Sequence, residues 1–148
     1  MDVKTPKSLA MEHEELLKEL EAGFVGGGKV AEAARRLMEM IRPHFATEEE
    51  LVLPPLSLLS AIAAGNITEE MKEVLHLTDQ LKKELPLRVT DHQDIGAALK
   101  ILRDAAKEEN RPEMLRFAKR LMIHAQNEEE VLYPASMMVG EWVKLTQS

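Results

Sequence analysis

The stretch HFATEEELVLP at residues 44–54 decides the fold, because it returns as HAQNEEEVLYP at residues 124–134. A histidine, three consecutive glutamates and a proline stand at the same relative positions in both stretches. A second match precedes each of them, since MEHEE at residues 11–15 aligns with TDHQD at residues 90–94 and brings a histidine opposite a histidine. The chain therefore contains two similar halves, each with a single histidine followed by a His-x-x-x-Glu motif.

Residues that favour helices dominate the composition. Hydrophobic residues make up 45% of the chain and charged residues 30%, and no stretch alternates between polar and apolar residues as a strand would. We therefore predict an all-α protein. Because a repeated pair of helical hairpins closes into a bundle, the predicted architecture is an up-down-up-down antiparallel four-helix bundle with an extra short helical connection between the two hairpins.

The chain is predicted to form one domain, residues 1–148, a length that suits a single hydrophobic core. Its two helical-hairpin repeats span about 7–54 and 87–134. A helical segment, 55–86, is expected to join them.

Proline and glycine set the predicted limits of the helices. Pro86 is expected to end one helix, and Gly140 is expected to precede a tail that docks on the bundle through Trp142 and Val143. The long helices are predicted at about 7–22, 29–53, 68–86, 87–109 and 112–138.

Six polar residues interrupt the apolar faces of these predicted helices. Residues four apart lie on one face of a helix, so each motif histidine shares a face with its motif glutamate. Those faces are otherwise apolar, as are the faces that carry the single histidine of each half. The six residues are His13, His44, Glu48, His92, His124 and Glu128.

An inward glutamate needs a strong partner, because burial of an unpaired carboxylate costs several kcal/mol. No lysine or arginine lies on the apolar faces beside Glu48 or Glu128. One core histidine, or one His-x-x-x-Glu on a helix surface, is common without any metal. Four histidines and two glutamates that converge from four helices are instead the ligands of a two-metal site. Nitrogen and oxygen ligands alone would accept iron, manganese or zinc.

Other polar residues are not predicted to bind metal. His76 is expected to face away from the apolar side of its helix, and Tyr133 is expected to be a packing residue. The glutamates next to each motif glutamate leave the apolar face, so we predict that they are solvated or at most contact the ligands; they are Glu49, Glu50, Glu129 and Glu130.

Composition and charge exclude several classes of function. The chain has no cysteine, which excludes disulfides, iron–sulfur clusters, thiolate metal sites and cysteine nucleophiles. A formal charge of −7 argues against a nucleic-acid partner. No apolar segment is long enough to cross a bilayer, and the N-terminal residues lack the apolar core of a signal peptide. We therefore expect no membrane partner and a cytoplasmic location.

The six residues resemble the duplicated pattern of hemerythrin-like (HHE) cation-binding domains, over a span from about Ser8 to Tyr133. Family members are antiparallel four-helix bundles with a non-haem di-iron centre bridged by two carboxylates. The resemblance implies that the ligands divide by half: His13 and His44 would bind one iron, His92 and His124 would bind the other, and Glu48 and Glu128 would bridge them.

One departure from the family pattern concerns a fifth histidine of the oxygen-carrying hemerythrins, which lies four residues from another histidine on the third bundle helix. Arg88 and Gly96 stand at that spacing from His92. The resemblance therefore implies an open coordination position for water, O₂ or nitric oxide, with space near Gly96. The ligand set is similar to that of hemerythrin-like proteins that repair iron–sulfur centres, although those usually carry cysteines and this chain has none.

The resemblance favours a protein that binds O₂ or nitric oxide on two iron ions, in sensing, storage or detoxification. Three alternatives stay open. The first is a di-iron redox enzyme. The second is an iron donor, repair protein or sensor that acts through a redox or iron-accepting protein partner. The third is a structural bundle with a vestigial site.

Overall fold

Within residues 3–147, which the structure describes, the chain forms helices and no strand. The coordinates are those of a computed structural model. The prediction of an all-α protein is therefore confirmed. The α-helices are α1 (Lys7–Glu21), α2 (Gly28–Thr47), α3 (Leu59–Ala63), α4 (Leu75–Glu108), α5 (Pro112–Asn127) and α6 (Tyr133–Thr146).

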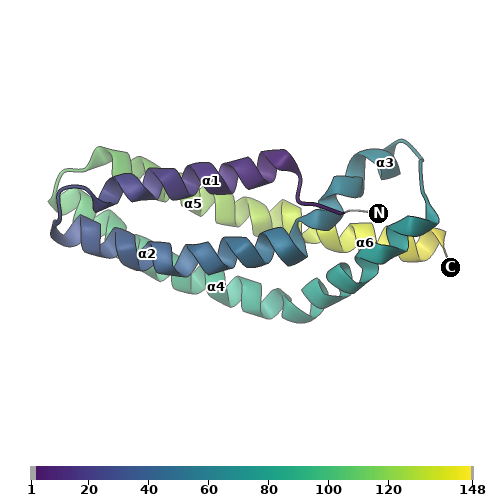
Figure 1. Ribbon diagram of the computed structural model, residues 1–148. Helices are drawn as coiled ribbons and strands as arrows, with labels where there is room; N and C mark the ends of the chain where they lie inside the picture. The colour runs from purple at the N-terminus through teal and green to yellow at the C-terminus, as the bar shows by residue number, and fades with distance from the viewer. Residues whose placement is uncertain (1–2, 148) are drawn as a thin grey trace.

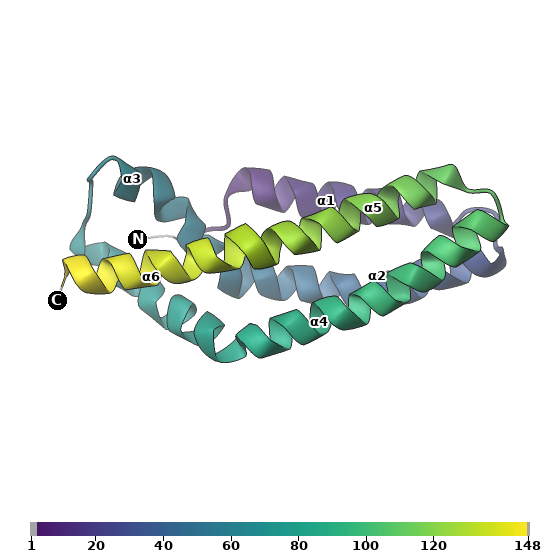
Figure 2. The same cartoon turned by 180° about the vertical axis from the view of Figure 1, so that it is seen from behind.

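The long helices lie side by side along the molecule (Figures 1 and 2). α1, α2, α4 and the continuous rod of α5 and α6 follow one another with a reversal of chain direction at each connection (Figure 1). α2 packs against α4, and α1 packs against both α2 and α5. The short α3 stands apart from these rods, toward the end of the molecule where α6 ends (Figure 1).

Apolar side chains fill the space between the rods. One cluster includes Leu16, Ile41 and Leu102, each fully buried, and a second surrounds Leu81 and Tyr133. Burial of a leucine side chain stabilises a fold by roughly 1.5–3 kcal/mol, so these clusters supply much of the driving force for folding. Directly after α2 and α5, Glu48 and Glu128 lie between residues of the first cluster and residues of the second.

α4 does not end at Pro86 as the sequence predicted, but runs through it to Glu108. A proline inside a helix removes one hydrogen bond and crowds the preceding turn, so a helix that continues through a proline is kinked there. α4 is accordingly bent (Figures 1 and 2). The prediction of separate helices at 68–86 and 87–109 is therefore wrong. Glu69–Val74 forms a 3₁₀ turn, and one bent helix follows it.

The tail predicted after Gly140 is instead part of α6, which continues to Thr146. Gly140 lies against α4 so closely that a Cβ atom there would overlap the side chain of Thr78. The absence of a side chain thus lets the helix continue along α4. Val143 is buried, as predicted for a docking residue, whereas Trp142 remains 45% exposed.

A π-helical turn follows α2 at Glu48–Val52, and another follows α5 at Glu128–Leu132. In the first of them, the N–H of Leu53 donates to the carbonyl oxygen of Glu48, five residues earlier, at 2.8 Å. Such turns are rare within helices and occur often at functional sites. They occupy equivalent positions in the two halves, so the repeat extends to the backbone around each motif glutamate.

Candidate metal centre

The six residues predicted to bind metal come together inside the molecule, and none of their side chains is more than 9% exposed. The helices position them because each residue lies on the face that its helix buries. The contributors are α1 with His13, α2 with His44, α4 with His92, α5 with His124, and the two π turns with Glu48 and Glu128. His76 is exposed, as predicted.

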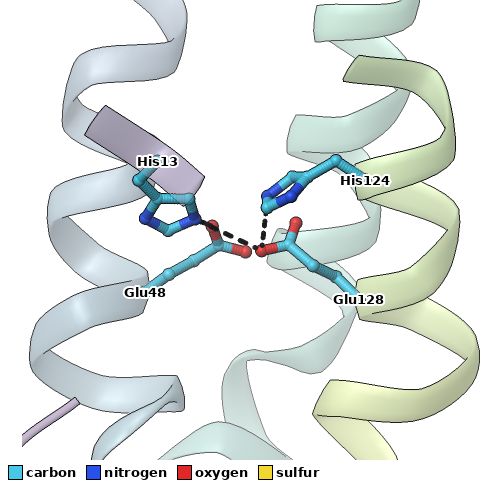
Figure 3. A group of neighbouring side chains, drawn as sticks. All are labelled: His13, Glu48, His124 and Glu128. Carbon is cyan, nitrogen blue, oxygen red and sulfur yellow. Dashed lines mark ion pairs between the residues drawn. The ribbon is translucent and has the colours of Figure 1, made fainter. Parts of the chain in front are cut away.

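Four of these side chains, His13, Glu48, His124 and Glu128, surround a first position (Figure 3). The Nε2 atom of His13 lies 3.3 Å from Oε1 of Glu48 and 3.7 Å from Oε2 of Glu128. The Nε2 atom of His124 lies 3.2 Å from the same Oε2 atom. All four atoms are buried without a hydrogen-bond partner. Because buried polar atoms are normally paired, four that face one another in this way fit a cation that would bind them all.

A second position lies between His44, Glu48, His92 and Glu128. Oε2 of Glu48 lies 3.2 Å from Nε2 of His44, and Oε1 of Glu128 lies 3.1 Å from Nε2 of His92. The two histidine nitrogens are 3.1 Å apart. Ligands about 2.1 Å from one ion are separated by about 3 Å, so this spacing also fits a metal. Each glutamate directs one oxygen to each position, which is the arrangement of a bridging carboxylate.

The grouping of the histidines differs from the one that the family resemblance implied. That grouping put His13 with His44 and His92 with His124, whereas the side chains cluster in other pairs in the structure. His13 shares a position with His124, and His44 shares one with His92. Both pairs come from adjacent helices, since α1 packs against α5 as well as against α2, and α4 packs against α2 as well as against α5. Each position is thus assembled from both halves of the repeat.

The single histidine of each half contacts the glutamate that directly follows the motif glutamate. Oε2 of Glu49 lies 3.0 Å from Nδ1 of His13, and Oε2 of Glu129 lies 3.2 Å from Nδ1 of His92. These two glutamates therefore contact the candidate ligands, which is the most that the sequence predicted for them. A carboxylate at the outer nitrogen of a histidine fixes the ring and directs the other nitrogen toward a metal.

The motif histidine of each half contacts an acidic residue from the other half. Oδ2 of Asp91 lies 3.2 Å from Nδ1 of His44. The equivalent contact joins Glu12 to Nδ1 of His124. Sequence reasoning missed both acidic residues. The signal that could have revealed them is that an acidic residue directly precedes the single histidine in both halves.

The carboxylates change the pKa values of the buried histidines. Burial alone would lower the pKa of His13, but the surrounding carboxylates, that of Glu128 foremost, outweigh burial and raise it to about 10. At His92 and His124 as well, burial would lower the pKa, but contact with the carboxylate of Glu128 raises it. The pKa values of both histidines are therefore raised. Burial would raise the pKa of Glu128, yet the histidines hold it well below its ordinary range. The cluster therefore retains protons that a bound metal ion would displace.

Tyr133 reaches the second position from the start of α6 and is fully buried. Its hydroxyl donates a hydrogen bond of 2.5 Å to Oε2 of Glu48, and its oxygen lies 3.2 Å from Nε2 of His92. Burial, together with the charges of Glu48 and Glu128, raises the pKa of Tyr133, so the phenol keeps its proton. The sequence predicted a packing residue only. The available signal was that the equivalent residue of the first half is Leu53, which has no hydroxyl.

The second position lies close to the protein surface. His44 and Arg88 line a surface hollow of about 320 Å³, and Nη2 of Arg88 lies 3.4 Å from Oδ2 of Asp91. His92 and Gly96 line another hollow, of about 90 Å³. A Cβ atom at Gly96 would meet nothing within 4 Å, so the space implied near this glycine is present.

The comparison with known families agrees with this geometry. The model of a family described as the hemerythrin HHE cation-binding domain matches residues 6–136, a range that includes all six residues of the cluster. No curated protein and no solved structure matches the chain. Within residues 3–147, no helix is both long enough and apolar enough to span a membrane.

Proposed function

The chain belongs to the hemerythrin HHE cation-binding domain family, and we propose that it holds two non-haem iron ions and binds O₂ or nitric oxide on them. The observation that carries the proposal is the set of four unpaired buried atoms at the first position, next to two glutamates that face both positions. Reduced iron would supply electrons to the bound gas. In this proposal α1, α2, α4 and α5 form the antiparallel four-helix bundle expected from the sequence, with the metal centre in its interior.

Each metal ion would take two histidines and one oxygen from each glutamate. His13 and His124 would hold one ion, His44 and His92 would hold the other, and the glutamates would bridge them. Four protein ligands leave coordination positions free on an ion that prefers six, which is what a small external ligand requires. The outer carboxylates would keep the imidazole nitrogens directed at the ions.

The ion held by His44 and His92 is the one that we expect to bind the gas. A hollow beside Gly96 reaches His92, whereas the ring of Phe45 stacks on His13 with the centroids 3.9 Å apart. At the spacing where oxygen-carrying hemerythrins have a fifth histidine, Arg88 and Gly96 provide no imidazole. The second position therefore has the same number of protein ligands as the first but a shorter route from the surface.

Anaerobic reconstitution with ferrous iron tests the proposal. Metal analysis should give two iron ions per chain, and absorption spectra should change reversibly when O₂ or nitric oxide is added and removed. His44→Ala should lower the iron content, whereas His76→Ala, which changes an exposed histidine, should not. A wild-type protein that takes up no iron would overturn the proposal. Repeated turnover with an electron donor would instead favour a redox enzyme that uses the same centre.

A further inference from the structure

The two bridging glutamates have different hydrogen bonds, although the repeat makes them equivalent. Oε2 of Glu48 accepts a hydrogen bond from the hydroxyl of Tyr133. Oε1 of Glu48 and Oε2 of Glu128, which face the first position, are buried without a hydrogen-bond partner. The residue equivalent to Tyr133 in the first half is Leu53, which is buried and has no polar side-chain atom. A hydroxyl donor is thus present on the side of the second position.

The packing of Tyr133 holds its hydroxyl in place. The phenol ring lies nearly parallel to the ring of His92, at an angle of 17° with the centroids 5.7 Å apart. The side chain is fully buried, and its oxygen lies within 3.2 Å of Nε2 of His92 as well as beside Oε2 of Glu48. Both of these atoms face the same position. The hydroxyl therefore stands among the atoms that would surround the second metal ion.

We propose that Tyr133 is a positioning residue that makes the His44–His92 metal ion the one that binds external ligands, and that it favours ligands whose bound atom carries negative charge. This inference rests on the proposed function. A hydrogen bond to Oε2 of Glu48 draws electron density from that oxygen and weakens its bond to the ion, which keeps the ion receptive to another donor. The buried guanidinium of Arg88, in the hollow next to His44, adds positive charge on the same side.

Azide, a small anion, is the probe that tests this role on the iron-loaded, oxidised protein. Tyr133 is the only tyrosine of the chain, so replacing all tyrosine with 3-fluorotyrosine changes this hydroxyl alone and makes it a stronger donor. Tyr133→Phe removes the hydroxyl and keeps the ring. Ser136→Ala is the matched control, because it removes another buried hydroxyl, one that donates to the carbonyl oxygen of Val52 at 2.7 Å.

Absorption titrations with azide, together with iron analysis of each protein, should separate the four proteins. The dissociation constant should rise about tenfold or more in Tyr133→Phe, as expected for a hydrogen bond to a charged group. It should fall below the wild-type value with 3-fluorotyrosine and stay unchanged in Ser136→Ala. The order of the azide dissociation constants tests the role of the Tyr133 hydroxyl even if one substituted protein is unstable.

Three results would overturn the inference. Equal azide affinities in the wild-type, Phe and fluorotyrosine proteins would remove the role of the hydroxyl while leaving the proposed function intact. Loss of iron from Tyr133→Phe would make Tyr133 a residue for metal retention and not for ligand selection. Failure of the iron-loaded wild-type protein to bind azide, O₂ or nitric oxide would overturn the proposed function and the inference together.

Discussion

The two metal positions are built from equivalent side chains, but their surroundings differ. At the first position, Phe45 stacks on His13 and covers it. The repeat places Ala125 in the corresponding place, and this small residue lines the hollow beside His92. His13 is therefore covered by an aromatic ring, whereas its counterpart His92 lies next to a hollow.

The same contrast recurs at the neighbouring positions of the repeat. Leu17 packs on the apolar core in the first half, and its counterpart Gly96 leaves space in the second. Leu53 is apolar, and its counterpart Tyr133 donates a hydrogen bond into the cluster. The candidate ligands thus match between the halves while the enclosing residues do not. A duplicated site of this kind can hold two metal ions and still direct an external ligand to one of them.

Removal of a glutamate that faces both positions should prevent metal binding at both of them, so that no difference between the positions remains. In Glu48→Ala both positions lose an oxygen ligand, and the remaining carboxylate cannot balance two cations. We expect little or no metal after reconstitution and desalting, measured by elemental analysis. Glu50→Ala, which changes an exposed glutamate of the same π turn, should keep the wild-type content. A fully loaded Glu48→Ala protein would contradict the shared role.

Closing the hollow should make the second position resemble the first. Ala125→Phe introduces the side chain of the first half, and we expect ligand association to slow by at least about tenfold, which an added barrier of ~1.4 kcal/mol produces. Stopped-flow mixing of the reduced, loaded protein with nitric oxide measures this rate. Ile123→Phe introduces the same side chain at an exposed position of α5 and should leave the rate unchanged. An unaltered rate in Ala125→Phe would mean that ligands arrive by another route.

The outer carboxylates should affect one position each. Asp91→Asn removes the charge beside His44 and should weaken metal binding at the second position by about 10- to 100-fold. Glu12→Gln removes the charge beside His124 and should do the same at the first position. Titration of the metal-free proteins with ferrous iron against a competing chelator resolves the two sites. If either substitution weakens both positions equally, the assignment of these contacts to separate positions is incorrect.

The raised histidine pKa values predict a smaller, pH-dependent effect in the metal-free protein. The pKa of His13 rises from 6.5 to about 10 on folding, so folded protein binds more protons than unfolded protein between these values. The free energy of unfolding should therefore fall by more than about 1 kcal/mol as the pH rises through this window. Urea unfolding in the presence of a chelator at several pH values measures it. A free energy of unfolding that rises with pH over this window would contradict the prediction.

Helical periodicity was sufficient to predict which residues meet in the interior. The repeat of a single histidine and a His-x-x-x-Glu motif put all six residues on buried faces, and the structure brings them together. Helical periodicity could not predict which histidines share a metal position, because that depends on the packing between helices. α1 packs on both α2 and α5, and no periodicity within α1 tells whether His13 meets the histidine of α2 or that of α5.

Local signals also failed where tertiary contacts decide the outcome. Pro86 reads as a helix end in sequence, yet packing carries α4 through it as a bend. Gly140 resembles a helix terminator, but its missing side chain serves close packing against Thr78. Tyr133 is indistinguishable from a core residue until the chain places its hydroxyl beside Glu48.

Metal analysis of two double variants tests the central claim, that each position is assembled from both halves, most directly. His13→Ala with His124→Ala removes both histidines of the first position and leaves the second intact, so the protein should retain one metal ion per chain. His13→Ala with His44→Ala takes one histidine from each position and should retain clearly less. If instead the second variant keeps one ion and the first keeps almost none, the histidines pair within each half and the account is contradicted.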